Sequence, residues 1–209
     1  ISIPEYIGSD LCPTTESIQN MVKALSKKIS STLKSRDTNS LIEHHNNYTV
    51  YVVLMMSYCL GLRAIQDAFI TPDDIDHESG FVILSDKDNE FNYHSRLVRA
   101  PDLLLTQLKH YEEHRNYIIN TVFLNNKKIL NLEEIPYIFL LEDGCEPKTL
   151  KPKEVMAYIS AQLPLPLNSN RRYLRSHFEQ HDVPAEVISC FMGHWHLGEE
   201  PWSKYSSLI

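Results

Sequence analysis

The sequence has few cysteines and no long apolar run, and both shortages narrow the class of protein that it can encode. Its four cysteines, Cys12, Cys59, Cys145 and Cys190, lie far apart, so no two have the spacing of zinc ligands. We interpret them as reduced thiols, which are common in the cores of cytosolic proteins. The longest apolar run, YTVYVVLMMSYCLGL at residues 48–62, falls short of the about 20 residues of a membrane span and predicts a buried helix.

Positive charge is also scarce. The chain has 20 lysines and arginines against 27 acidic residues, a net charge of −7 and a pI of about 5.8, which argues against a general nucleic-acid binder. The charge is uneven, because acidic residues dominate residues 64–90, where Lys87 is the one base. Residues 148–178 are basic, so an anion could bind there; against Glu154 they contain Lys148, Lys151, Lys153, Arg171, Arg172 and Arg175.

The sequence shows no targeting segment. It begins with Ile1 rather than Met, and no basic start followed by an apolar signal region precedes the body of the chain. We therefore expect a fragment without a targeting peptide and a cytoplasmic location. Apolar residues make up 43% of the 209 residues, which is ample for a folded core.

The spacing of apolar residues predicts several helices. Residues 14–35 carry an apolar residue at every third or fourth position, and a second helix continues through the apolar run to Leu62. Pro101 opens a long helix, and residues 152–163, 171–181 and 184–192 predict shorter ones. The expected inner faces carry Ile18, Met21, Val22, Leu25, Ile29 and Leu33 on the first helix, and Leu104, Leu108, Tyr111 and Tyr117 or Ile118 on the long one.

Strands are predicted in two places. GFVILS and EFNYHSRLV, on either side of DKDN, form a candidate hairpin, and residues 135–141 form a candidate short strand. The stretch DGCEPKTLKPK that follows predicts a loop. The expected fold class is therefore α+β, mainly α-helical with a small antiparallel β-sheet.

Four short motifs then occur in a particular order. They are CLGLR at 59–63, SDKDN at 85–89, RYLRSHF at 172–178 and FMGHW at 191–195, with Tyr205 eleven residues beyond His194. In this order they resemble the catalytic domain of the tyrosine recombinases, the phage-integrase family, over about residues 45–209. The resemblance implies the catalytic-domain fold of that family for residues 41–209, preceded by an N-terminal helix or linker at 1–40.

The resemblance also implies catalytic roles. Arg63 and Arg175 would bind the oxygens of a DNA phosphodiester, because a guanidinium offers fixed, planar, bidentate donors. Tyr205 would be the nucleophile and would become joined to the 3′ phosphate. Lys87 would be the general acid for the leaving 5′ oxygen, and His194 would hydrogen-bond a phosphate oxygen.

Two positions depart from the family pattern. Arg172 stands where a histidine usually precedes x-x-Arg; it cannot act as a base at neutral pH, but it can bind phosphate and counts as a sixth site residue. Gln66 stands where an acid commonly follows the first arginine. The interval from Arg175 to His194 is also shorter than usual, and that from His194 to Tyr205 is longer.

Each motif also has a plainer interpretation. Arg63 could cap a helix C-terminus, and Lys87 could be an ordinary turn residue. Arg172 and Arg175 could lie on a solvated helix face, although Leu174 and Phe178 beside Arg175 would make an unpaired charge costly. His194 could be a core histidine and Tyr205 a packing tyrosine, while His194 and His196 have no nearby third residue to form a metal site.

These observations predict a site-specific DNA recombinase or integrase domain of a mobile genetic element. The expected partners are double-stranded DNA and further copies of the chain, as a tetramer on DNA; we expect no metal or other cofactor, no membrane and no small-molecule substrate. The alternative is a catalytically decayed module of the integrase fold with a DNA-binding or regulatory role. A strand-relaxing topoisomerase of the same chemistry is a third hypothesis, for which the first helix offers no support.

Overall fold

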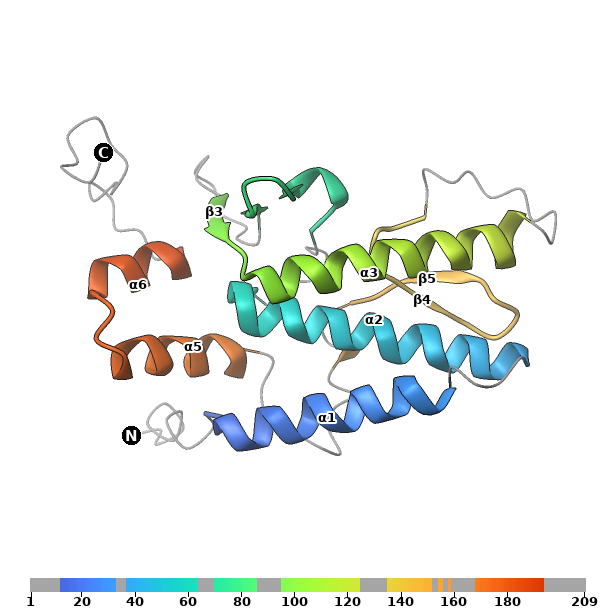
Figure 1. Ribbon diagram of the computed structural model, residues 1–209, viewed down its shortest axis with the longest axis horizontal. Coiled ribbons are helices and arrows are strands. Elements are labelled where there is room, and N and C mark those ends of the chain that lie inside the picture. Colours follow the sequence, from blue (N-terminus) through green and yellow to red (C-terminus); the bar gives the residue numbers. More distant parts are fainter. Residues whose placement is uncertain are drawn as a thin grey trace, which may run out of the picture.

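The computed structural model describes residues 12–32, 37–63, 70–85, 95–124, 135–151, 154–155, 158 and 168–193. Three long helices run side by side through the body: α1 (Thr15–Thr32), α2 (Thr38–Leu60) and α3 (Asp102–Ile118), with α2 in the middle (Figure 1). All three helices were predicted from the apolar spacing. A short π-helical segment (Ile119–Leu124) continues α3.

Helix α2 forms the centre of the main core. Its start is capped by Asp37, whose side chain accepts a hydrogen bond from the Ser40 backbone N–H, and its end by Gly61 in the left-handed conformation. The predicted buried helix is confirmed, since its apolar residues Val50, Val52, Val53, Leu54, Met56 and Leu60 are all buried. Within the described ranges, none of the helices has the length and apolar character needed to cross a bilayer.

The N-terminal helix belongs to the same core. Met21 and Leu25 of α1 are almost fully buried against α2, and the hydroxyl groups of Thr15 and Tyr173 lie 3.0 Å apart, which connects α1 to a later helix. The domain boundary expected at residue 40 stays a prediction. The four cysteines are free thiols.

A three-stranded antiparallel sheet follows α2 in the chain. It consists of β1 (Ile75–Asp76), β2 (Phe81–Leu84) and β3 (Arg96–Arg99) in that order, preceded by a 3-10 turn at Pro72–Asp74. The register pairs Val82 with Val98, both buried, and Ile83 with Leu97, both exposed. The two strands of the predicted hairpin are confirmed, whereas the DKDN segment with Lys87 lies outside the described residues.

A two-stranded ribbon packs against α2. It consists of β4 (Phe139–Leu141) and β5 (Pro147–Thr149), so the loop predicted for DGCEPKTLKPK is wrong at β5. The sequence gives no alternating apolar pattern at β5; the strand exists because it pairs with β4. On the other side of β4, the Asn46 amide donates to the Leu141 carbonyl and accepts from the Leu141 N–H, at 2.9 and 2.7 Å.

Two shorter helices complete the described chain. Helices α5 (Ser169–Gln180) and α6 (Ala185–Met192) were both predicted and lie beyond the C-terminal end of α2 (Figure 1). They share a small apolar cluster of Leu174, Ile188 and Met192. Most of the helix predicted at 152–163 lies outside the described residues. The expected fold class, mainly helical with small antiparallel sheets, is confirmed.

Candidate active site

The candidate site is built on the C-terminal end of α2. Gly61 ends the helix with a φ of 61°, which a residue with a side chain rarely adopts. A Cβ added to Gly61 would lie 3.3 Å from Phe191 and 3.4 Å from Leu174. The end of α2 therefore packs directly between α5 and α6, and the chain leaves it toward Arg63.

Arg171 joins the ends of two helices. Its Nη1 donates to the Gly61 carbonyl at 2.6 Å, and its Nη2 donates to the Met192 carbonyl at 2.7 Å. Next to it, the Asn170 amide donates to the carbonyls of Ser57 and Leu62. Helix α5 is thus fixed to the end of α2 through polar contacts as well as through its apolar face.

Two more arginines reach the same place from other parts of the chain. Arg63 Nη2 donates to the carbonyls of Met192 and Gly193, both at 3.1 Å. Arg96, on β3, donates from Nη2 to the Gly61 carbonyl at 3.0 Å. We call Arg63, Arg96 and Arg171 the arginine cluster.

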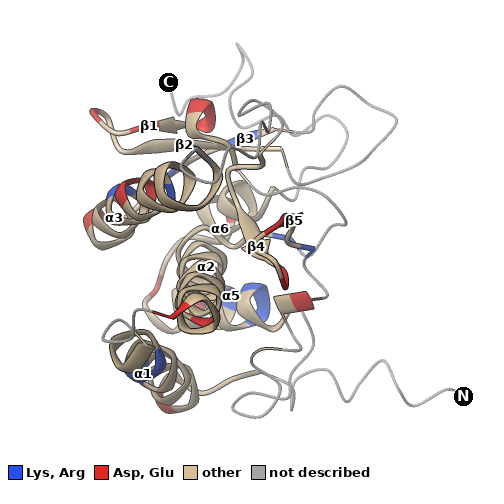
Figure 2. Cartoon of the chain, turned by 90° about the vertical axis from the view of Figure 1, so that its right-hand side faces the viewer, with Lys and Arg blue, Asp and Glu red and all other residues tan. Residues whose placement is uncertain are grey.

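The carbonyls explain how three like charges can gather here. Gly61 and Gly193 end α2 and α6, and a helix C-terminus carries about half a negative charge that favours nearby cations. A guanidinium keeps its proton when buried, so the cluster stays positive. Figure 2 shows Lys and Arg in blue on β3 and on α5, the two elements that contribute Arg96 and Arg171.

The structure places the residues predicted from the sequence unevenly. Arg63 lies in the arginine cluster. Arg172 is exposed on α5. Arg175 is also exposed, and its Nε donates to Glu179 one turn away at 2.9 Å, as on a solvated helix face; its catalytic role stays a prediction. Lys87, His194 and Tyr205 lie outside the described residues.

No catalytic role was predicted for Arg96 or Arg171 from the sequence, although weak signals for both exist. Arg96 and Val98 are two residues apart on a strand, so both face the core. Arg171 follows Asn170, which forms the buried face of α5 with Leu174. The hydrogen-bond partners of both arginines lie far away in the sequence, so a local pattern could not identify them.

Such a cluster can bind an oxyanion. Guanidinium groups pair with phosphate oxygens in fixed, bidentate geometry, and several of them can stabilise charge that develops on those oxygens during a reaction. Across the described segments, no group of three or more His, Cys, Asp or Glu side chains is placed to hold a metal ion. The hydrogen bonds described above join the three guanidinium groups to backbone carbonyls of Gly61, Met192 and Gly193.

Comparison with known proteins supports the fold. No protein-family model matches the chain, and no curated protein matches its sequence. Among solved structures, it is similar to the XerA recombinase, with a TM-score of 0.54 and 9% identity over 88% of this chain and 56% of that one.

The chain is also similar to the Tn1549 transposon integrase. The integrase complex with a circular intermediate DNA gives a TM-score of 0.54 at 11% identity, over 88% of this chain and 57% of that one. The integrase complex with transposon right end DNA gives a TM-score of 0.54 at 11% identity, over 89% of this chain and 58% of that one. The chain thus spans a little more than half the length of the solved structures that it matches. These likenesses confirm the tyrosine recombinase fold that the motifs predicted, and at this identity they concern the fold.

Proposed function

We propose that the chain is the catalytic domain of a site-specific DNA recombinase or integrase. It cuts and rejoins DNA strands through a covalent 3′-phosphotyrosyl intermediate on Tyr205. The observation that carries this proposal is the arginine cluster. Three guanidinium groups from segments far apart in the sequence meet at the ends of two helices, in a fold shared with recombinases.

The proposed reaction needs no oxidant, metal or nucleotide. The Tyr205 oxygen loses its proton to water and attacks the phosphorus, the bond between phosphorus and the 5′ oxygen breaks, and Lys87 gives a proton to that oxygen. Attack by the 5′ hydroxyl of another strand reverses these steps and releases Tyr205. Because a phenol has a pKa of about 10, nearby cations must favour its ionised form.

Arg63 and Arg171 of the arginine cluster supply those cations and hold the phosphate. Arg63 and Arg171 lie against the same Met192 carbonyl, so their charges act at one place. His194 follows Gly193 directly and begins the segment that leads to Tyr205. In this scheme His194 donates to a phosphate oxygen. Arg172 and Arg175, exposed on α5, bind the DNA backbone beside the cleaved phosphate.

The proposed partner is double-stranded DNA, with a tetramer of the whole protein assembled on two sites in the cytoplasm. The Tn1549 integrase was solved in complex with DNA, which supports a DNA substrate for a chain of this fold. The net charge of −7 confines DNA affinity to local basic surfaces, because phosphate contacts depend on lysine and arginine.

A suicide substrate tests the proposal. The protein is mixed with a library of labelled duplexes that carry a nick next to randomised sequence, so that cleavage releases a short fragment and traps the enzyme. Denaturing gels should show a covalent protein–DNA adduct for the intact chain and none for Tyr205→Phe. Tyr117→Phe, an exposed tyrosine on α3, is the matched control and should form the adduct normally.

Two results would contradict the enzyme proposal. One is a folded intact chain that forms no adduct with any library member; the other is an adduct that persists in Tyr205→Phe. DNA binding without any adduct would favour the alternative, a decayed integrase-fold module. The exposed positions of Arg172 and Arg175 are the observation that keeps this alternative open.

A further inference from the structure

Arg96 is a buried arginine on the core side of a strand. It is 6% exposed and, like Val98, faces inward, whereas Leu97 and Arg99 face solvent. A buried guanidinium costs several kcal/mol of desolvation unless hydrogen bonds and charges compensate it. The contacts of the Arg96 guanidinium must therefore offset this desolvation cost.

The contacts of Arg96 lie on two separate turns of the backbone. Its Nη2 donates to the Gly61 carbonyl, the same oxygen that accepts from Arg171. On the other side, a Cβ added to Gly193 would lie 3.2 Å from Arg96 Cδ and 3.5 Å from Nη1. The same hypothetical Cβ would lie 3.7 Å from Nη2 of Arg63, so the two guanidinium groups lie beside the Gly193 turn.

These turns begin the two segments that carry the proposed chemistry. Gly61 precedes Arg63 by two residues, and Gly193 immediately precedes His194. Arg96 itself lies on the strand that follows the Lys87 segment. The Arg96 side chain thus bonds the Gly61 turn, lies close to the Gly193 turn and belongs to the strand that follows the Lys87 segment.

We propose that Arg96 is a positioning residue that holds the Gly61 and Gly193 turns at a fixed separation, and so keeps Arg63 in place beside the Gly193 turn. This inference rests on the proposed function. Arg96 acts through the backbone rather than on DNA, in keeping with its burial. A misplacement of about 1 Å at a reacting centre can lower a rate about 10²-fold, so such a residue affects turnover more than binding.

The test compares Arg96→Met and Arg96→Lys with Arg99→Met, an exposed arginine of the same strand. The rate of adduct formation at saturating DNA and the half-saturating DNA concentration are measured with the nicked duplexes. Arg96→Met should lower the saturating rate about 10²-fold and change the half-saturating concentration less than about threefold. Arg96→Lys should restore part of the rate, and Arg99→Met should keep the saturating rate of the unmodified protein.

A second measurement separates this inference from the proposed function. Amide hydrogen exchange of the peptide that covers 188–193 should be faster in Arg96→Met than in the unmodified protein. Should Arg96→Met fail to fold, the same comparison is made with Arg96→Lys, whose folding is checked by circular dichroism. An unchanged saturating rate or an unchanged exchange rate would overturn the role of Arg96. Absence of any adduct from the unmodified protein overturns the proposed function, and hydrogen exchange then decides whether Arg96 holds the turn.

Discussion

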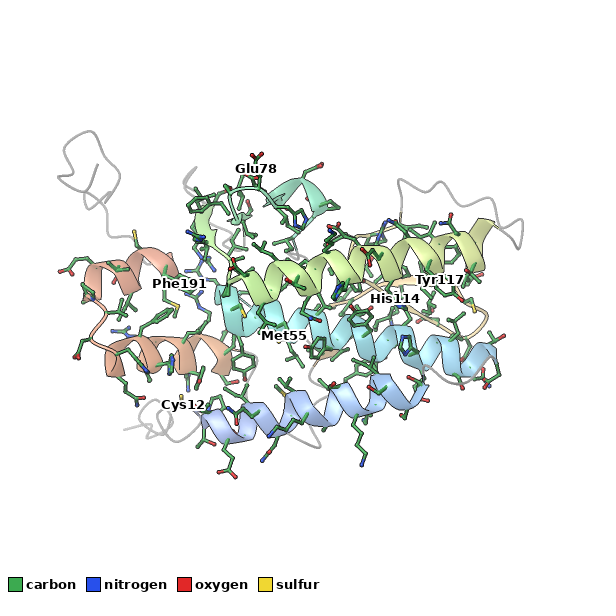
Figure 3. All side chains as sticks on the ribbon, in the orientation of Figure 1. Cys12, Met55, Glu78, His114, Tyr117 and Phe191 are labelled. Carbon is green, nitrogen blue, oxygen red and sulfur yellow. The ribbon has the colours of Figure 1, made fainter. Side chains whose placement is uncertain are left out.

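Helix α2 has a polar cluster near each of its ends, and the two clusters differ in the charge that they carry at pH 7. In its first half, His45 Nε2 donates to the Phe139 carbonyl and His45 Nδ1 lies 3.1 Å from Nε2 of His114. His44 lies edge-on to His114, which sits between α3 and α2 (Figure 3). We call His44, His45 and His114 the histidine cluster. At the far end of α2, the arginine cluster meets the Gly61 carbonyl.

The difference follows from the two side chains. Burial lowers the pKa of all three histidines, that of His114 to about 4 and that of His45 to about 3, and neighbouring imidazoles lower the pKa values of His45 and His114 further. The histidine cluster is therefore neutral at pH 7 and acts as part of the core. Arginine cannot give up its proton in this way. A cluster that stays charged at a helix end is suited to an anion, whereas a cluster that becomes neutral is suited to packing.

The largest expected effect lies in the arginine cluster. Arg63→Ala and Arg171→Ala should each slow adduct formation about 10²- to 10³-fold, because each removes a preorganised donor to the phosphate. Lys109→Ala, on the exposed side of α3, is the control. Arg175→Ala should cost less than Arg171→Ala. A larger loss with Arg175→Ala would favour the role that the family resemblance gives to Arg175.

The histidine cluster should make the protein sensitive to acid. The unfolded chain takes up protons as the pH falls through about 6.5, whereas the folded histidines resist protonation until their lowered pKa values are reached. The stability contributed by these histidines is therefore complete above about pH 7. As the pH falls it is lost from about 6.5 down to about 4 for His114 and about 3 for His45, by up to about 1.4 kcal/mol per pH unit for each of the two. Chemical denaturation at several pH values measures this slope.

A matched pair of variants assigns the acid sensitivity. His114→Gln should flatten the slope, whereas His110→Gln, an exposed histidine on the same helix, should leave it unchanged. Equal slopes in the two variants would mean that other groups control acid unfolding.

Asn46 tests whether the polar residues of the first half of α2 are structural. Asn46→Ala leaves the N–H and C=O of Leu141 without their partner, which should lower the free energy of unfolding by about 2 to 4 kcal/mol. Asn116→Ala, on the exposed face of α3, should change it by less than about 0.5 kcal/mol. Urea denaturation of both variants at pH 7.5 is the measurement. Equal stabilities would show that the Asn46 contacts contribute no net stability.

The smallest expected effect is at Gly193. Gly193→Ala should destabilise the fold by about 1 to 2 kcal/mol, because alanine is strained at a φ of 62° and its Cβ would meet Arg96. Gly144→Ala has a similar positive φ and no atom within 4 Å of the added Cβ, so it measures the strain alone. Thermal unfolding of the pair should show Gly193→Ala to be the less stable. The reverse order would mean that contact of the added Cβ with Arg96 does not add to the destabilisation.

The sequence predicts the long helices and the hairpin strands well, because their apolar residues repeat with a clear period. Met21 and Leu25 on α1 and Leu104 and Leu108 on α3 are buried as that period requires. The strand β5 has no such pattern and depends on pairing with β4. The polar side chains of His44, His45 and Asn46 are buried with hydrogen-bond partners on α1, α3 and β4, and these partners cannot be identified from local spacing.

The candidate site shows the same division. Arg63 was assigned to the site through the family resemblance of CLGLR, and it lies in the arginine cluster. The choice among Arg171, Arg172 and Arg175 depends on which face of α5 meets the end of α2. That face is fixed by Asn170 and Leu174, the first bound to the carbonyls of Ser57 and Leu62 and the second in an apolar cluster. The RYLRSHF motif thus pointed to helix α5, whereas tertiary packing determines which of its arginines lies in the arginine cluster.

The bonds from His45 and Asn46 to β4 also affect how molecules of this chain can meet. Phe139 and Leu141 use their outward-facing backbone groups to bond these two side chains. An open strand edge is a template for pairing with another chain and a starting point for aggregation. On this edge of the ribbon, these backbone groups already bond side chains of α2. A strand from a neighbouring molecule would therefore first have to displace helix α2.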